Sequence, residues 1–103
     1  MIVCYNKNET WKRPYDGAIS APIDASIVAT YMMLEAQNLG IGSCWVMHFD
    51  PSALKNSFNI PDYIEPLAIL VLGIKHDDAF PSEMHTKFRP IDEIIFYETF
   101  KEE

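Results

Sequence analysis

The chain has 103 residues, enough for one small domain, and its hydrophobic content of 49% excludes a disordered chain. The net charge of −7, from 8 basic and 15 acidic residues, argues against nucleic acid or an anionic membrane as the main partner, because both require clustered Lys and Arg. Apolar runs such as LAILVLGI fall far short of the roughly 20 residues that span a bilayer, and no signal-peptide pattern opens the sequence. We therefore expect a cytoplasmic protein that contacts neither nucleic acid nor a membrane.

The first residues, MIVCY at 1–5, predict a buried strand. A sequence that opens inside a strand suggests a fragment or one product of a split pair; the alternative is a short domain whose first strand begins at its N-terminus. Residues 6–22 are polar and rich in turn-forming residues, which predicts a long surface loop. Within this loop we expect Trp11 and Tyr15 either to pack over a pocket or to cover the local core.

Residues 24–38 predict a helix that organises the rest of the chain, because good helix formers follow one another without Gly or Pro. Asp24 is the expected N-cap, and Gly40 is placed to close the helix in the left-handed conformation. A surface helix carries one apolar stripe, whereas this one is apolar nearly all the way round. A chain this short has little interior in which to bury it, so the helix should need a second surface from another segment or subunit. Its apolar members are Ala25, Ile27, Val28, Ala29, Tyr31, Met32, Met33, Leu34 and Ala36.

The second half of the chain predicts two more strands and one helix. Residues 43–47 indicate a short buried strand, and a helix is expected from Asp50, as N-cap, to about Phe58. The run at 66–74 is apolar throughout, as in a central strand covered by helices on both faces. Residues 91–100 suit a strand or a short helix, and such an apolar tail suggests an arm that packs on another subunit. This order predicts an α/β or α+β domain with a thin sheet, as if elements were missing.

Taken singly, the chemical signals are weak. The sequence has no catalytic triad, phosphate loop or Cys/His spacing typical of a metal site. The HDD segment at 76–78 suits either a metal or a solvated loop. Glu35 and Glu65 are acid–base candidates, or else residues of a helix surface and a turn. Lys87 and Arg89 suit an anion such as phosphate, or are ordinary surface charges.

Taken together, the motifs form a recognisable order over roughly residues 24–97. An Asp-started helix with MMLEA precedes a GIGSCW turn, a second helix, an Ile-Pro before PLAILVLG, and a late KFRP followed by an acidic and aliphatic run. This order closely resembles the C-terminal half of the nitroreductase family of flavin oxidoreductases. Each motif alone is loose, whereas the five in sequence are fairly specific.

The resemblance implies an α+β fold of the nitroreductase type, with residues 1–103 forming the C-terminal portion of one three-layer α/β/α sandwich domain. It implies a homodimer with FMN at the subunit interface. It also implies ping-pong transfer of electrons from NADH or NADPH to a nitroaromatic, quinone or related acceptor. Two alternatives remain open: a truncated, non-catalytic remnant used for dimerisation or ligand binding, and another small-ligand enzyme on the same fold. The N-terminal half of the family, which contributes further phosphate and ring contacts, is absent from this sequence.

The resemblance also implies site residues. Lys87 and Arg89 match the late basic pair that holds the FMN phosphate. Four residues match the segment beside the isoalloxazine ring, where backbone amides near the last two would face flavin N5 and O4. Many family members carry a small residue where this chain has His48, so the imidazole is expected to narrow the pocket or to contact substrate. No side chain is expected to act as acid or base, and no metal is expected. The four ring-side residues are Trp45, Val46, Met47 and His48.

Overall fold

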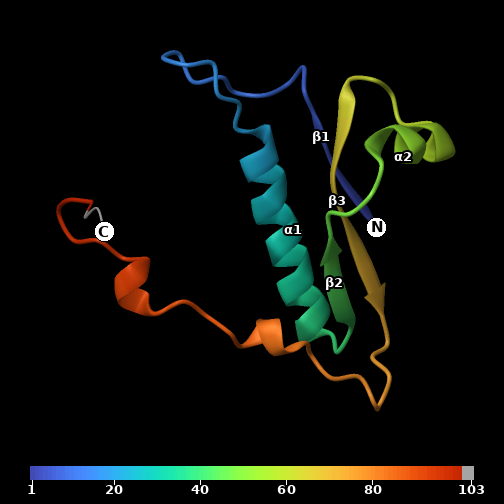
Figure 1. Ribbon diagram of the computed structural model, residues 1–103. Coiled ribbons are helices and arrows are strands. Elements are labelled where there is room, and N and C mark those ends of the chain that lie inside the picture. Colours follow the sequence, from blue (N-terminus) through green and yellow to red (C-terminus); the bar gives the residue numbers. More distant parts are fainter. Residues whose placement is uncertain (101–103) are drawn as a thin grey trace.

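The computed structural model describes residues 1–100 of the chain (Figure 1). The elements in chain order are β1 (Ile2–Asn6), α1 (Ala21–Asn38), β2 (Gly42–Val46), α2 (Pro51–Phe58), β3 (Ile64–Gly73) and two 3-10 turns, η1 (Glu83–His85) and η2 (Ile91–Glu93). The order strand, helix, strand, helix, strand agrees with the order that the sequence predicts. The result is a small α+β fold built on one three-stranded sheet.

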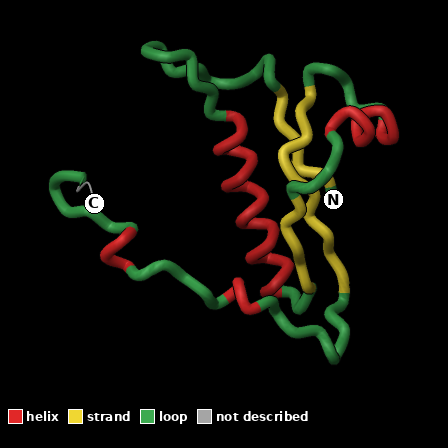
Figure 2. The backbone as a smooth tube through the Cα atoms, in the orientation of Figure 1, coloured by secondary structure: helices red, strands yellow, loops and turns green. Residues whose placement is uncertain are grey.

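The sheet has the order β1-β3-β2, and both outer strands run antiparallel to β3. The prediction of a central strand at residues 66–74 is therefore confirmed, with β3 as that strand. The prediction that helices cover both faces of this strand is wrong for its second half. Helix α1 lies along one face, and α2 lies on the other side of the sheet near the start of β3 (Figure 2). Val71 is therefore 55% exposed, although its neighbour Leu70 is fully buried on the α1 side.

The start of α1 corrects the sequence expectation. Asp24 is not the N-cap, because the helix begins at Ala21 and Ser20 takes the cap position. Pro22 is accommodated in the first turn, where its missing N–H costs no intrahelical hydrogen bond. Asp24 therefore lies one turn inside the helix, and its carboxylate accepts a hydrogen bond of 2.8 Å from the Ser20 hydroxyl. An acidic side chain here still favours the helix, because it faces the positive end of the helix dipole.

The end of α1 confirms the role predicted for Gly40. Its φ of 72° lies in the left-handed region, which costs little without a Cβ. The Gly40 amide donates to the carbonyl of Gln37 at 3.1 Å, and the Ile41 amide donates to that of Ala36 at 2.8 Å. This pair of bonds is a Schellman motif, which satisfies the last carbonyls of the helix and turns the chain directly into β2.

The core lies between the inner side of α1 and the sheet. Ala25 and Ala29 are buried, and they pack with Val3 and Leu70. Met32, also on α1, packs against the edge of this cluster. Small alanine side chains let the helix approach the strands closely, so a compact contact forms with few large residues.

Helix α2 forms as predicted. The Asp50 carboxylate accepts hydrogen bonds from the Ser52 and Ala53 amides at 2.8 and 3.2 Å, which satisfies two free donors of the first turn. Asn59 ends the helix in the left-handed conformation, with φ of 52°. No residue of α2 is buried, so this short helix has little apolar contact with the sheet.

The loop between β1 and α1 projects from the body as a short hairpin. An isolated bridge joins Lys12 to Ile19, and Arg13 forms an ion pair with Asp16 at the turn. Trp11 is 61% exposed and Tyr15 is 95% exposed. In the described structure, neither residue therefore packs over a pocket or covers the core as expected.

Residues 75–100, here called the C-terminal arm, extend away from the sheet (Figure 1). Every residue from 71 to 100 is exposed, and only the single turns η1 and η2 interrupt the arm. The segment expected to be a strand or short helix therefore contains only a 3-10 turn at Ile91–Glu93. The radius of gyration is 17.6 Å, whereas a compact chain of this length would have about 13 Å. Among the residues described, no helix has the length and apolarity to cross a membrane.

Candidate functional site

The ring-side segment predicted from the sequence lies at the end of β2. Trp45 is half-buried and packs against the core, opposite Leu70 of β3. Val46 is the last paired residue, opposite Ile69. Beyond it the chain leaves the sheet, and the side chains of Met47, which is 60% exposed, and His48 face solvent.

The backbone of this turn offers hydrogen-bond donors. Within residues 1–100, the amides of Met47 and His48 donate no hydrogen bond, whereas the Phe49 amide donates to the Met47 carbonyl at 3.0 Å. Two neighbouring exposed N–H groups suit a ligand with acceptor atoms along one edge. The exposed imidazole of His48 stands beside them, so its expected contact with substrate stays a prediction.

The predicted phosphate cations lie on the C-terminal arm between η1 and η2. Both Lys87 and Arg89 are exposed, and the Arg89 Nε lies 3.6 Å from the Glu93 carboxylate. Within the described part of the chain, no ion pair involves Lys87. A guanidinium and an ammonium two residues apart suit a phosphate dianion, although Glu93 competes for the guanidinium.

The described chain does not by itself bring the two predicted halves of the site together. The arm leaves the body near the C-terminal end of α1 and runs away from the sheet, whereas the turn after β2 leads towards α2 (Figure 1). The described residues therefore fit FMN by donor chemistry, with amides for the ring edge and cations for the phosphate. They do not form one closed cavity around it.

The outer side of α1 carries an open apolar groove of about 430 Å³. Large apolar residues along this side of the helix are exposed to solvent, among them Ile27 (52%), Tyr31 (70%) and Leu34 (62%). The prediction that the helix is apolar on most sides is confirmed, with alanines facing inward and larger residues facing outward. Contiguous exposed apolar surface of this kind marks an interaction surface. The groove is lined by Pro22, Ile23, Ser26, Ile27, Thr30 and Tyr31.

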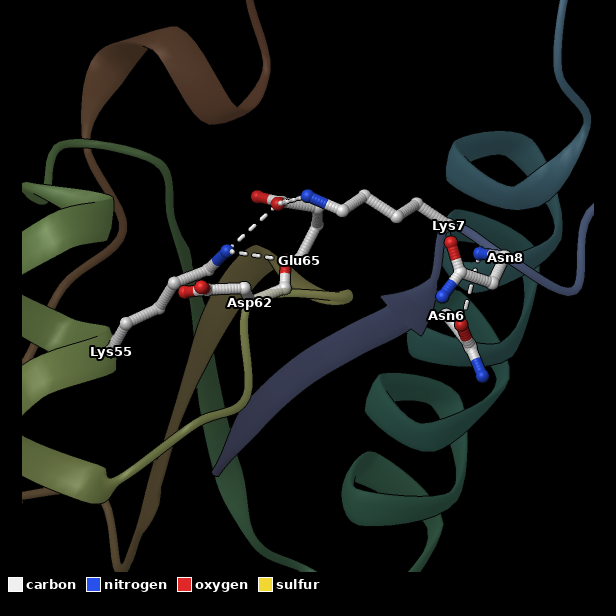
Figure 3. A network of polar contacts seen from close by, with 6 residues as sticks. All are labelled: Asn6, Lys7, Asn8, Lys55, Asp62 and Glu65. Carbon is white, nitrogen blue, oxygen red and sulfur yellow. Dashed lines mark hydrogen bonds and ion pairs between the residues drawn. The ribbon is translucent and has the colours of Figure 1, made fainter.

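The structure adds a charged cluster that the sequence did not reveal (Figure 3). The Glu65 carboxylate accepts a hydrogen bond of 2.7 Å from the Lys55 ammonium and one of 3.0 Å from that of Lys7. These two ammonium groups hold the pKa of Glu65 below its ordinary value of 4.5. Glu65 lies in β3 rather than in the expected turn. The sequence signal that could have pointed to this cluster is an acidic residue next to a long apolar run. Burial raises the pKa of the nearby Cys4 thiol, against a smaller lowering by Lys55.

Two other sequence candidates show surface positions. Glu35 is exposed on α1, 3.5 Å from the Asn38 side chain, which agrees with the helix-surface alternative. In the 76–78 segment, the His76 Nδ1 lies 3.8 Å from the Asp78 carboxylate, and both side chains are exposed. No group of three metal-ligating side chains occurs among the described residues.

Comparison with known proteins identifies related chains. The profile of the Nitroreductase family matches residues 1–74. A Bacillus subtilis (strain 168) protein named "Putative NAD(P)H nitroreductase MhqN" is 30% identical over 92 residues, which cover 89% of this chain and 41% of that protein.

Solved structures give the same result. A nitroreductase family protein from Clostridium difficile 630 is 41% identical with a TM-score of 0.85, and the match covers 96% of this chain and 58% of that one. A nitroreductase family protein from Clostridium novyi NT is 26% identical with a TM-score of 0.66, over 74% of this chain and 41% of that one. The chain thus spans about half the length of these relatives or less. Because the family profile matches most of the chain, and the fold matches as well, the chain belongs to the nitroreductase family.

Proposed function

We propose that residues 1–103 form the C-terminal portion of a single nitroreductase-like domain in an FMN-dependent, homodimeric oxidoreductase of the cytoplasm. Bound FMN would accept electrons from NADH or NADPH and pass them to a nitroaromatic, quinone or related acceptor. The observation that carries the proposal is family membership, and it is supported by the amides of Met47 and His48, which donate to no group within residues 1–100. The name of the Bacillus subtilis relative agrees with a nicotinamide donor.

In this proposal the chain's own residues bind and orient the cofactor. The amides of Met47 and His48 would donate to the flavin ring edge, where donors stabilise added negative charge. Trp45 and Val46 anchor that turn to the core, because they are its last residues paired with β3. Lys87 and Arg89 would neutralise the phosphate, and no side chain supplies an acid or base.

A second copy of the chain is the proposed partner. Two features support it: the apolar groove along the outer side of α1, and the C-terminal arm, whose two 3-10 turns pack on no helix or strand among the described residues. An arm that crosses to a second subunit would bring its cations to a site built from two chains. This arrangement answers why the arm and the β2 turn lie apart within one subunit.

The coverage of the relatives favours one alternative. The chain spans 41% of the Bacillus subtilis protein and 58% of the Clostridium difficile structure, so a large part of each longer protein has no counterpart in these residues. The alternative is a non-catalytic remnant that dimerises or binds a ligand through the same surfaces. It predicts self-association without flavin.

An FMN titration of the purified protein separates these functions. The proposal predicts a yellow protein, or one that takes up added FMN and is then reduced by NADH or NADPH. A colourless protein that binds no added FMN would contradict the oxidoreductase, and a dimer with that property would support the remnant.

Arg89→Ala tests the phosphate contact. Loss of a charge-assisted bond worth about 1.5–3 kcal/mol should weaken FMN binding by roughly tenfold or more. Lys12→Ala removes an exposed cation from the hairpin instead, and it should leave FMN binding unchanged. If the two variants bound FMN with equal affinity, the prediction that Arg89 contacts the FMN phosphate would be wrong.

A further inference from the structure

Helix α2 is held to the sheet by very little apolar contact. It has eight residues, too few for a stable helix in isolation, and none of them is buried. Phe58, its largest apolar residue, is 63% exposed. Only Leu54 and Lys55 are even partly covered. The position of α2 therefore depends on whatever else ties it to the sheet.

The charged cluster supplies that tie (Figure 3). Lys55 is the less exposed of the two lysines, with 17% of its side chain exposed. Its ammonium group lies 2.7 Å from the carboxylate of Glu65 on β3. The same ammonium lies 3.4 Å from the Asp62 carbonyl. Lys7, from the segment after β1, holds the same Glu65 oxygen at 3.0 Å, and its side chain is 46% exposed. One carboxylate thus joins α2, β3 and the end of β1.

Helix α2 in turn fixes the turn that precedes it. The Asp50 carboxylate caps the helix, and the Asp50 carbonyl accepts the first intrahelical bond from Leu54 at 3.0 Å. Only three residues, 47–49, separate this cap from the last strand pair at Val46. A short linker between two anchored points has little freedom, whereas the same linker beside an undocked helix would be loose.

We propose that Glu65, through Lys55, is a positioning residue that docks α2 and thereby fixes the peptides of the 47–50 turn. This inference rests on the proposed function, in which those peptides face the edge of the flavin ring. Glu65 then acts on FMN at a distance, by setting the direction of two N–H groups. Lys7 makes a smaller contribution, because its side chain is more exposed and ion pairs in solvent are weak.

Hydrogen exchange measured by mass spectrometry tests the docking directly and needs no flavin. Lys55→Met keeps the apolar stem and removes the charge. It should speed exchange in residues 47–58 by about tenfold or more, while α1 exchanges at its original rate. Lys7→Met should give a smaller change, about two- to threefold. Lys55→Arg, which keeps the charge, should stay near the wild-type rate.

Two exchange results would overturn the inference: unchanged rates in residues 47–58 of Lys55→Met, or equal acceleration of α1 and α2. Should Lys55→Met unfold the chain, Glu65→Gln gives the same comparison, because it preserves the side-chain shape and one acceptor oxygen. In that variant too, rates in residues 47–58 equal to those of the wild type would reject the docking role.

The reduction potential of bound FMN tests the positioning role. With FMN saturating, loosened donors at the ring edge should shift the potential to more negative values in Lys55→Met, and Lys55→Arg should restore it. Faster exchange with an unchanged potential would leave Glu65 as a purely structural residue and reject the positioning role. A wild-type protein that binds no FMN would refute the proposed function and the flavin role, while the exchange result would still decide whether Glu65 docks α2.

Discussion

The two sides of α1 are opposite in construction, although they belong to one helix. The inner side presents small residues such as Ala25 and Ala29, which are buried against Val3 and Leu70 of the sheet. The outer side presents much larger side chains, and more than half of the surface of Ile27, Tyr31 and Leu34 is exposed in the described structure. In a self-sufficient domain the larger side chains would face the core, since burying them stabilises the fold most. Most of the apolar surface that α1 could bury is therefore left for contact with a surface outside the described residues.

The C-terminal arm shows the same contrast. The sheet strands are joined by backbone pairing, whereas among the described residues neither 3-10 turn of the arm packs on a helix or strand. Yet the end of the arm is rich in apolar residues, with Phe96 and Phe100 in contact at a ring-centroid distance of 4.4 Å. The outer side of α1 and the end of the arm are thus two exposed apolar regions of the described chain, and in the proposed homodimer a second subunit would cover both.

The largest effect is expected inside the body. Leu70→Ala, at a fully buried site, should lower the free energy of unfolding by about 2–5 kcal/mol, through lost burial and the cavity left behind. Val71→Ala, one residue further and 55% exposed, should cost less than about 1 kcal/mol. Urea denaturation followed by circular dichroism measures both. Equal losses would mean that the far face of β3 is covered in solution.

On the outer side, a charge should break assembly and spare the fold. Ile27→Asp places a carboxylate in the groove, and it should weaken self-association by about tenfold or more while helix content is retained. Gln37→Asp adds the same charge to α1 outside the groove and should leave association intact. Light scattering over a concentration series gives the result, and identical association in both variants would exclude the groove from the interface.

The smallest effect concerns acid. Because the folded-state pKa of Glu65 is lowered, its charge stabilises the native state fully above the ordinary value of 4.5. That contribution is lost as the pH falls through the folded-state pKa, when Lys55 and Lys7 lose their shared partner. Amide NMR signals of α2 should therefore broaden or shift in acid before those of α1. Simultaneous change in both helices would indicate one global acid transition instead.

Local chemistry made the elements predictable from sequence. Asp50 before Pro51 gave the start of α2, and Gly40 gave the end of α1, because capping depends on neighbouring residues only. The N-cap of α1 was misplaced by four residues, since Asp24 and Ser20 are both of residue types that favour the cap position and Pro22 is tolerated between them. The central position of β3 followed from its continuous apolar run.

Long-range features were not predictable in the same way. Nothing near Glu65 in the sequence indicates that Lys7, 58 residues away, shares its carboxylate with Lys55. The ring-side residues Trp45 to His48 and the cations Lys87 and Arg89 came from family resemblance, and their role in binding stays a prediction. Their separation within one subunit could not be read from the sequence, because it depends on the path of the arm.

Sedimentation of the native protein, followed at a flavin absorption band, tests the central claim most directly: that a second copy covers the outer side of α1 and the pair holds FMN. The account predicts a species of twice the 11.8 kDa chain mass that carries flavin colour with it. A species of 11.8 kDa that stays colourless after FMN is added would contradict the account.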